Sequence, residues 1–472
     1  MARVHWFRKD LRLNDNEALA EGIRAAMNED GVITALYVFD LEAFEQLEGI
    51  RQHSLRAGVA ALAHSLETKG AELNLQQARG LADVAAAVVR VAQAAGTKEV
   101  HAMRLYDPAG VAEQNAVGLA LQAVGIFLRL TGDNYAVSPG KVLKPSDGAP
   151  YRVYTPFYKA WSQLLPAGAA AAPQPMPELG QDWHCPQVAQ KTPSQGLPEC
   201  TKAAPFKVVA GEAFALRTFE RFRQRALADY SESRNRADLS GTSHLSHALA
   251  HGEVHPRTLL AQLGDSQGEE VFRKELAWRE FYADVLWHNP ASLTDYYVPV
   301  FAKMRYDTGA LADERLAAWQ QGKTGYPMVD AGMRQLLAEG WMHNRVRMIV
   351  ASFLVKDLHL EWQQGAQWFE RHLSDFDPAS NVHGWQWTAG CGTDASPYYR
   401  VFNPVSQGLK FDPKGEYVRK YVPELRHLAG VAAHEPWNYS LGYREGYVTR
   451  IVDHALEREE ALRRLEELKA LR

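Results

Sequence analysis

The sequence predicts an α/β N-terminal domain with a doubly wound parallel sheet, joined by a long linker to an all-α domain. In the first part of the chain, short apolar runs alternate with segments of helical spacing, as in doubly wound α/β domains. From Gly211 onward, apolar residues recur every three or four positions without strand alternation. Residues 163–205 contain eight prolines and no periodicity, which is typical of a linker. The predicted bounds are 1–135, 136–210 and 211–472.

The N-terminal domain is predicted element by element from short apolar runs and the helical segments between them. A run such as I-T-A-L-Y-V-F-D at 33–40 is typical of a buried parallel strand. The predicted strands are 3–9, 33–40, 71–75, 99–105 and 127–130, and the predicted helices are 16–27, 51–69, 81–95 and 112–123. Ligands of such sheets bind beyond the carboxyl ends of the strands, here near Asp10, Asp40 and Tyr106–Asp107. The first strand is not followed by G-x-G-x-x-G, which argues against an ordinary dinucleotide site.

Composition limits the class of protein. The 472 residues are 46% hydrophobic and 23% charged, which predicts a globular protein of two or three domains. We expect no membrane span, because no apolar run approaches ~18 residues. We expect no secretory signal, because the N-terminal segment M-A-R-V-H-W-F-R-K-D is charged and has no apolar h-region. Three cysteines without matched spacing favour a reducing, cytoplasmic location. The net charge of −4 does not favour nucleic-acid binding, although Arg217–Arg236 contains six arginines that could contact phosphates.

The stretch Thr324–Gly392 predicts a pocket wall. It contains five tryptophans, asparagine beside arginine in W-M-H-N-R-V-R-M (341–348), and the loop D-F-D-P-A-S-N (375–381). Buried polar groups are costly without partners, so this mixture is unlike core packing alone. The two aspartates of the loop lack a third ligand at metal-binding spacing, so we predict that no metal binds.

Two further segments carry chemistry. In Tyr230–Ser246 small hydroxyls precede an apolar helix, which suits a bound phosphate and equally suits a plain helix cap. Glu275, Trp278 and Tyr282 share one helix face. Desolvation there would favour a neutral acid that donates a hydrogen bond, and the alternative is an exposed ion pair with Arg279.

Together these motifs resemble the DNA photolyase/cryptochrome family, from W-F-R-K-D-L-R-L-N-D-N at Trp6–Asn16 to N-P-V-S-Q-G at Asn403–Gly408. The resemblance is greatest to the class I photolyases that repair cyclobutane pyrimidine dimers. It implies a deoxyribodipyrimidine photo-lyase in which light-excited reduced FAD passes an electron to a dimer flipped out of DNA. We expect a cytoplasmic monomer that acts on damaged DNA and not on membranes.

The resemblance also assigns residues. His244 stands where the family usually has arginine. Those matching the FAD site are Tyr230, Thr242, Ser243, Leu245, Ser246, Asn344, Arg347, Asp375, Asp377 and Asn381, with Asp375 paired to Arg347 and Asn381 facing flavin N5. Those matching the DNA site are Arg234, Glu275, Trp278, Tyr282, Asn344, Arg345, Trp387 and Gln407. Glu275, Asn381 and Met348 are the catalytic candidates, although Met348 equally suits core packing.

Two features depart from the family pattern. Trp385 and Trp362 match the tryptophan chain that photoreduces the flavin, but no tryptophan stands at the outer position, so Tyr306, or Trp319 by another route, is the candidate terminal donor. Segment 105–115 departs from the family's antenna pattern, which leaves a folate or deazaflavin antenna open. Glu113 falls where the family has a pterin-contacting glutamate, but the sequence favours a solvated helix residue there.

Two other functions within the family remain open. One is a cryptochrome-like FAD photosensor without repair, against which Glu275, Met348 and Asn381 argue. The other is a photolyase for (6-4) photoproducts, which would carry a histidine pair near 341–347, where the sequence offers His343.

Overall fold

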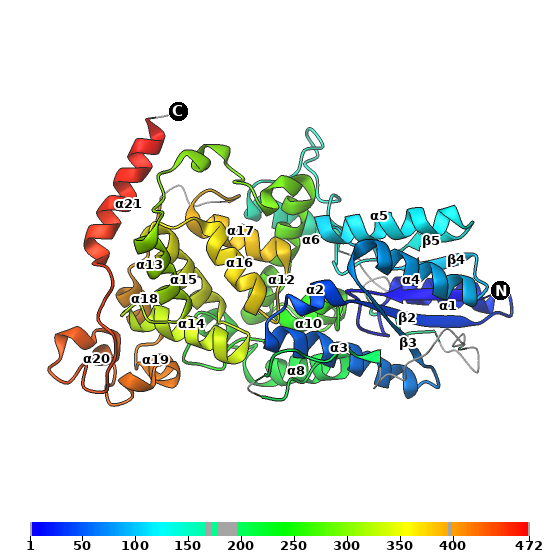
Figure 1. Cartoon of the computed structure of the whole chain (residues 1–472), viewed down its shortest axis with the longest axis horizontal. Coiled ribbons are helices and arrows are strands. Elements are labelled where there is room, and N and C mark those ends of the chain that lie inside the picture. Colours follow the sequence, from blue (N-terminus) through cyan, green and yellow to red (C-terminus); the bar gives the residue numbers. More distant parts are fainter. Residues whose placement is uncertain are drawn as a thin grey trace.

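The computed structural model describes residues 2–165, 172–177, 183, 196–204, 206–394 and 399–470. An α/β domain occupies one end of the molecule and a larger helical domain the other (Figure 1). His184 and Cys185, for which the sequence predicts no metal binding, lie outside the described residues. No helix within these ranges is long and apolar enough to cross a membrane.

In the described residues, five parallel strands form one sheet in the order β3-β2-β1-β4-β5. The strands are β1 (Arg3–Phe7), β2 (Ile33–Asp40), β3 (Leu73–Ala78), β4 (Glu99–Ala102) and β5 (Phe127–Leu130). The helices that connect them are α1 (Glu17–Met27), α2 (Leu41–Glu45), α3 (Gly49–Glu67), α4 (Gly80–Ala94) and α5 (Pro108–Ala123). The predicted α/β class is confirmed, and predicted element ends differ from the observed ones by a few residues.

The helical domain begins at α8 and ends at α21, beside the C-terminus at the far end from the sheet (Figure 1). Its central helices bury apolar side chains on several sides, and α15 is buried along most of its length. The elements that follow α5 in the described chain are α6 (Tyr154–Leu164), α8 (Glu212–Arg225), α9 (Tyr230–Ser233), α10 (Ser246–His251), α11 (Pro256–Leu260), α12 (Gln267–His288), η2 (Pro290–Leu293), η3 (Pro299–Lys303), α13 (Ala310–Gln320), α14 (Pro327–Glu339), α15 (Asn344–Lys356), α16 (Trp362–His372), α17 (Pro378–Ala389), α18 (Pro404–Phe411), α19 (Glu416–Tyr421), η4 (Pro423–Leu425), α20 (Val431–His434), η5 (Pro436–Asn438) and α21 (His454–Lys469).

The segment between the domains is partly structured. Helix α6, within the predicted linker, packs Tyr154, Phe157 and Trp161 against the buried side of α12. The buried carboxylate of Glu280 on α12 accepts hydrogen bonds from Trp161 Nε1 and from two backbone N–H groups at residues 136 and 137. An anchored carboxylate of this kind satisfies loop donors that would otherwise be buried unpaired. The aromatic residues of α6 therefore hold this segment against α12 of the helical domain.

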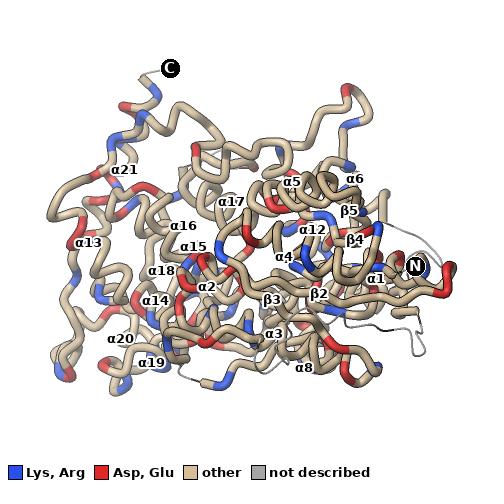
Figure 2. The backbone as a smooth tube through the Cα atoms, turned by 45° about the vertical axis from the view of Figure 1, so that its right-hand side comes forward, with Lys and Arg blue, Asp and Glu red and all other residues tan. Residues whose placement is uncertain are grey.

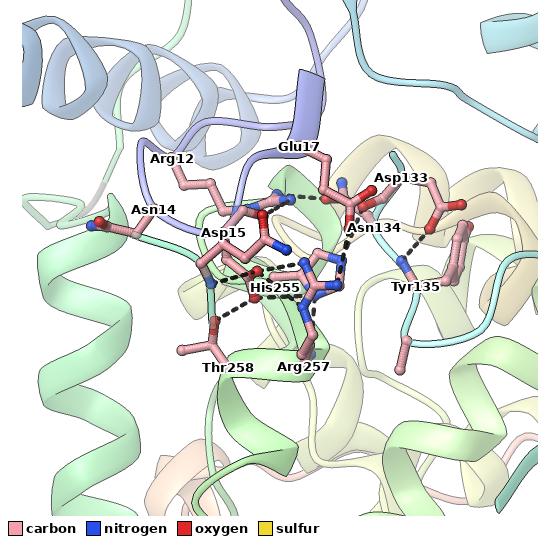
Figure 3. Close-up of polar contacts among 12 residues, drawn as sticks. Arg12, Asn14, Asp15, Glu17, Asp133, Asn134, Tyr135, His255, Arg257 and Thr258 are labelled. Carbon is pink, nitrogen blue, oxygen red and sulfur yellow. Dashed lines mark hydrogen bonds and ion pairs between the residues drawn. The ribbon is translucent and has the colours of Figure 1, made fainter. Parts of the chain in front are cut away.

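A buried polar cluster also holds the domains together (Figure 3). Asp15, which precedes α1, accepts hydrogen bonds from Arg257 at 2.5 and 3.0 Å and from Thr258 at 3.0 Å. Arg257 also pairs with Glu17 at 2.9 Å. Beside this cluster, Gly252 lies so close to the Lys9 carbonyl oxygen that a Cβ atom would be 1.9 Å from it. The backbones of the two domains thus meet directly.

Candidate functional site

The exposed side of α12 carries the predicted acid. Glu275 forms an ion pair with Arg234 at 2.6 Å, and both side chains are half-buried. Burial raises the pKa of the Glu275 carboxyl, and Arg234 and Arg345 partly offset that rise. The alternative ion pair with Arg279 is not formed, because Arg279 donates instead to the Asn134 and Leu249 carbonyls. Glu275 is therefore a partly desolvated carboxyl on this helix face, and not one half of an exposed ion pair with Arg279.

Trp278 forms an aromatic surface beside this acid. Its ring stacks on Tyr154 with centroids 3.7 Å apart and planes 9° apart, and the rings of Tyr282 and Phe281 lie 5.5 and 5.7 Å away. The Tyr154 hydroxyl donates to the Lys274 carbonyl at 2.7 Å, which fixes that ring. Parallel contact at this distance holds Trp278 in one orientation. Tyr154 lies on α6, far from Trp278 in the chain, and the sequence carries no sign of this stacking contact.

The start of α15 contributes a cap, two arginines and an amide. His343 Nδ1 accepts from the Arg345 N–H at 3.1 Å, and burial lowers the pKa of His343 to about 4, so the imidazole is neutral. Asn344 is exposed and Met348 half-buried. Arg345 donates twice to Asn235 Oδ1, at 2.8 and 3.1 Å. These contacts orient Arg345 toward the same region as Arg234.

The predicted pair between Arg347 and Asp375 is present at 2.7 Å. The Asp375 carboxylate is almost fully buried, and its Oδ1 has no hydrogen-bond partner among the described residues. A buried oxygen in this state is costly unless a bound group satisfies it. This atom is therefore suited to contact a polar ligand.

The segment 242–246 forms a turn ahead of the short helix α10. Ser243 Oγ accepts from the Leu245 N–H at 3.4 Å, and Ser246 Oγ accepts from Trp341 Nε1 at 3.2 Å. Thr242 is half-buried, and His244 has a left-handed φ of 53° with its ring 4.5 Å from that of Trp341. His244 thus lies near His343, a proximity that the linear spacing did not reveal.

The remaining FAD-matching residues lie on α17 and α9. Asp377 caps α17 by accepting from the Ser380 N–H at 2.8 Å. Asn381 donates its amide to the Ala366 carbonyl at 3.0 Å, so its nitrogen faces α16 and its oxygen faces away. Tyr230 is buried against Phe222 and Phe272.

Two DNA-matching residues remain. Trp387 is half-buried and donates to the Asp394 carbonyl at 3.0 Å. Gln407 is half-buried on α18.

Cavities lined by described residues border the predicted FAD site. One, of about 870 Å³, lies between the domains: it takes residues 6–9, Asp40 and Asp107 from the sheet domain, and Trp362 and Asn381 from the helical domain. A second, about 340 Å³, is lined by Leu245 and His244, and a third, about 30 Å³, by Asp377 and Arg279. The carboxyl ends of the strands therefore border a ligand-sized space, as predicted. Asp10 does not line it, because Asp10 is buried in hydrogen bonds with His5, Asn16 and Arg8.

Glu113 lines the large cavity. From the sequence, this residue was either a pterin contact or a solvated helix residue. Glu113 pairs with the buried Arg8 at 3.2 Å, and burial raises the pKa of the Glu113 carboxyl. It is therefore partly desolvated.

Trp362 on α16 and Trp385 on α17 are both buried. Trp385 packs over Gly365, where a Cβ atom would lie 2.1 Å from the indole. Trp319 contacts Trp385 at 6.1 Å but is fully buried. Tyr306 is half-buried, so of these two candidates only Tyr306 reaches toward solvent.

The comparisons with known proteins bear on this arrangement. Residues 3–178 match the family model described as DNA photolyase, and residues 272–467 match the FAD binding domain of DNA photolyase. This chain belongs to the DNA photolyase family. It is 38% identical to a deoxyribodipyrimidine photo-lyase of Vibrio cholerae, over 98% of each chain. It is 35% identical to one of Escherichia coli, over 97% of each.

Solved structures of photolyases and cryptochromes superpose on nearly the whole of this chain. A class III photolyase from Agrobacterium tumefaciens superposes with a TM-score of 0.87 at 36% identity, covering 99% of this chain and 98% of that one. A Synechocystis cryptochrome superposes with a TM-score of 0.84 at 26% identity, covering 98% of each chain. The predicted family, fold class and FAD-binding domain are confirmed.

The residues present fit FAD. Asp375 Oδ1 is a buried, unpaired acceptor in the described chain, Arg347 is the adjacent cation, and the Asn381 amide is fixed by α16. Hydroxyls at 242–246 add donors suited to a diphosphate. Asp375, Arg347 and Asn381 all lie within residues 272–467, the part of the chain that matches the FAD binding domain of DNA photolyase.

Proposed function

We propose that this protein repairs cyclobutane pyrimidine dimers in DNA in a light-dependent reaction. The observation that carries the proposal is the half-buried Glu275, with its raised pKa, beside the fixed Trp278 surface. The names of the photo-lyase relatives support it. Bound FAD would supply the light-driven electron, and the protein would supply binding, orientation and electrostatics.

Each residue then has a specific part. Glu275 in its neutral form donates a hydrogen bond to a dimer carbonyl that gains negative charge. Trp278 and Trp387 contact the flipped-out dimer, with Tyr282, Met348 and the exposed Asn344 at the edge. Arg234, Arg345 and Gln407 bind the DNA backbone, which salt would weaken.

The cofactor contacts follow from the site. Asp375, Arg347, Asp377 and Tyr230 surround FAD together with Thr242, Ser243, Leu245 and Ser246, while Asn381 presents its amide to the flavin ring. Trp385, Trp362 and Tyr306 restore the reduced cofactor.

An antenna chromophore, a folate or a deazaflavin, would bind in the cavity between the domains. The volume of this cavity, about 870 Å³, and the pairing of Glu113 with Arg8 in its wall support this proposal.

The cytoplasmic location and the monomeric state of the protein stay predictions.

The decisive experiment is repair of an oligonucleotide that bears one thymine dimer, in light and in the dark, by wild-type enzyme and by Glu275→Ala. We expect repair only in light. Losing a hydrogen bond to a charged group costs about 1.5–3 kcal/mol, so the variant should be roughly tenfold to a hundredfold slower. Glu269→Ala, at an exposed cap on the same helix, is the matched control.

Two other outcomes have definite meanings. FAD that is bound and reduced without repair of either lesion would favour a photosensor. Repair of a (6-4) photoproduct in a parallel reaction, and not of the dimer, would favour the other photolyase type, for which His244 and His343 are the nearby pair.

A further inference from the structure

The aromatic row that contains Trp362 continues through two tyrosines. The Tyr296 ring lies 6.1 Å from that of Trp362, edge-on at 89°. It lies 6.4 Å from the ring of Tyr306, with the planes 22° apart. Aromatic rings at these separations pack against one another. Tyr296 therefore connects the buried tryptophan to the half-buried Tyr306.

The Tyr296 hydroxyl has a proton acceptor beside it. Tyr296 donates to Glu361 Oε1 at 3.1 Å. Glu361 directly precedes Trp362, at the N-cap position of α16, and its side chain makes no cap hydrogen bond there. The Tyr306 ring, 6.4 Å from that of Tyr296, places the second phenol next to the first. The phenolic proton of Tyr296 thus has an acceptor already in place, and Tyr306 is the neighbouring donor.

The surroundings disfavour a charged phenol. Burial raises the pKa of both hydroxyls above the ordinary tyrosine value, so both tyrosines are protonated at neutral pH. Loss of an electron alone would leave a buried positive charge, which is costly. Loss of the proton to Glu361 in the same event would keep Tyr296 neutral.

We propose that Tyr296 and Tyr306 form a proton-coupled electron relay that restores Trp362, with Glu361 as the proton acceptor. This rests on the proposed function, in which Trp362 loses one electron toward light-excited, oxidised FAD. Oxidised Trp362 takes one electron from Tyr296, whose O–H bond breaks as an O–H bond forms on Glu361. The neutral Tyr296 radical then takes a hydrogen atom from Tyr306.

A small thiol in solution completes the balance. It gives a hydrogen atom to the Tyr306 radical and becomes a thiyl radical, while Glu361 releases its proton to water. The relay thereby replaces the tryptophan that is missing from the outer position.

The test uses the FAD-loaded enzyme in its oxidised state under blue light. The variants are Tyr296→Phe, Tyr306→Phe and Glu361→Gln, with Tyr297→Phe as the neighbouring control. Electron paramagnetic resonance identifies the radical when thiol is omitted, and visible absorbance gives the photoreduction rate when thiol is present.

We expect a neutral tyrosyl radical in wild type and in Tyr297→Phe. Tyr296→Phe should show a tryptophan radical instead and photoreduce about tenfold more slowly or worse. Tyr306→Phe should leave a shorter-lived radical on Tyr296. Glu361→Gln should form the tyrosyl radical more slowly than wild type. In wild type we expect this radical to form more slowly in heavy water than in ordinary water, and in Glu361→Gln this difference should be smaller. A wild-type radical and rate in Tyr296→Phe would overturn the relay.

Failure of the relay can be told from failure of the proposed function. Wild-type enzyme reduced chemically with dithionite bypasses the relay, so its repair of a thymine dimer in light tests the function alone. If Tyr296→Phe does not bind FAD, Glu361→Gln decides the matter, because a wild-type rate and isotope effect in that variant would exclude the proton step.

Discussion

At the scale of single residues, the pairing of Arg234 with Glu275 controls the acid. Burial raises the pKa of Glu275, and the guanidinium 2.6 Å away opposes that rise. A carboxyl with a raised pKa is neutral below that pKa and loses its proton as the pH increases through it. The neutral donor form is therefore the low-pH form.

This predicts a pH effect of Arg234→Met. Removing the cation should raise the pKa of Glu275 further, so repair at saturating DNA should persist to higher pH than in wild type. The measurement is the pH profile of light-dependent repair, with Glu275→Gln as a variant that cannot titrate. An alkaline limb that stays at the wild-type position in Arg234→Met would contradict the assignment.

The sequence alone could identify site residues that have a distinctive chemical type. It could not identify the side chains on other elements that contact them. The place of Glu275 on one helix face with Trp278 was predictable from helical spacing, and the Arg347–Asp375 pair was implied by the family resemblance. The partner of Glu275, the support of Trp278 by Tyr154, and the contact of Tyr296 with Glu361 were not, since each joins separate elements. Such contacts depend on tertiary packing, which has no local signature.

At the scale of elements, α16 and α17 approach closely because α16 has a glycine where Trp385 packs. A Cβ atom on Gly365 would lie 2.1 to 2.6 Å from three atoms of the indole, which is far inside contact distance. The helix periodicity of both segments was predictable, whereas their separation depends on this one missing side chain.

Gly365→Ala should therefore destabilise the protein by about 1–3 kcal/mol, the usual cost of overpacking. Gly384→Ala on α17 is the control, since a Cβ atom there meets nothing within 4 Å. In a helix interior this control should be neutral or stabilising by about 0.5–1 kcal/mol. Chemical denaturation followed by tryptophan fluorescence compares the two, and equal stabilities would contradict the packing argument.

At the scale of the whole molecule, charge does not separate the domains. Lysine and arginine alternate with aspartate and glutamate along the chain in both domains (Figure 2).

Buried histidines make the stability of the whole molecule depend on pH. Burial lowers the pKa of His101, His343 and His383 to about 4 and that of His251 to about 3.

These four histidines predict acid sensitivity. They are neutral in the folded state, whereas in the unfolded chain they take up protons near pH 6.5. Their stabilising contribution is present above pH ~6.5 and is lost as the pH falls toward about 4. Burial also raises the pKa of Glu280 to about 7 and of Asp357 to about 6, and these two carboxyls oppose the trend.

We therefore expect the free energy of unfolding to fall between pH ~6.5 and ~4. Urea denaturation at intervals across that range measures it. His383→Asn, which cannot titrate, should give a shallower decline whatever its absolute stability. A decline as steep as in wild type would exclude His383 as a contributor.

The cavity of about 870 Å³ takes its walls from both domains. A ligand in this cavity must contact both domains at once, so its binding and the docking of the domains are thermodynamically linked. Docking raises the ligand's affinity by the same factor by which the bound ligand favours docking. Loosening the Asp15–Arg257 cluster would then weaken a ligand that this cluster never touches. Occupancy of the cavity would, in turn, report how firmly the two halves of the molecule are held together.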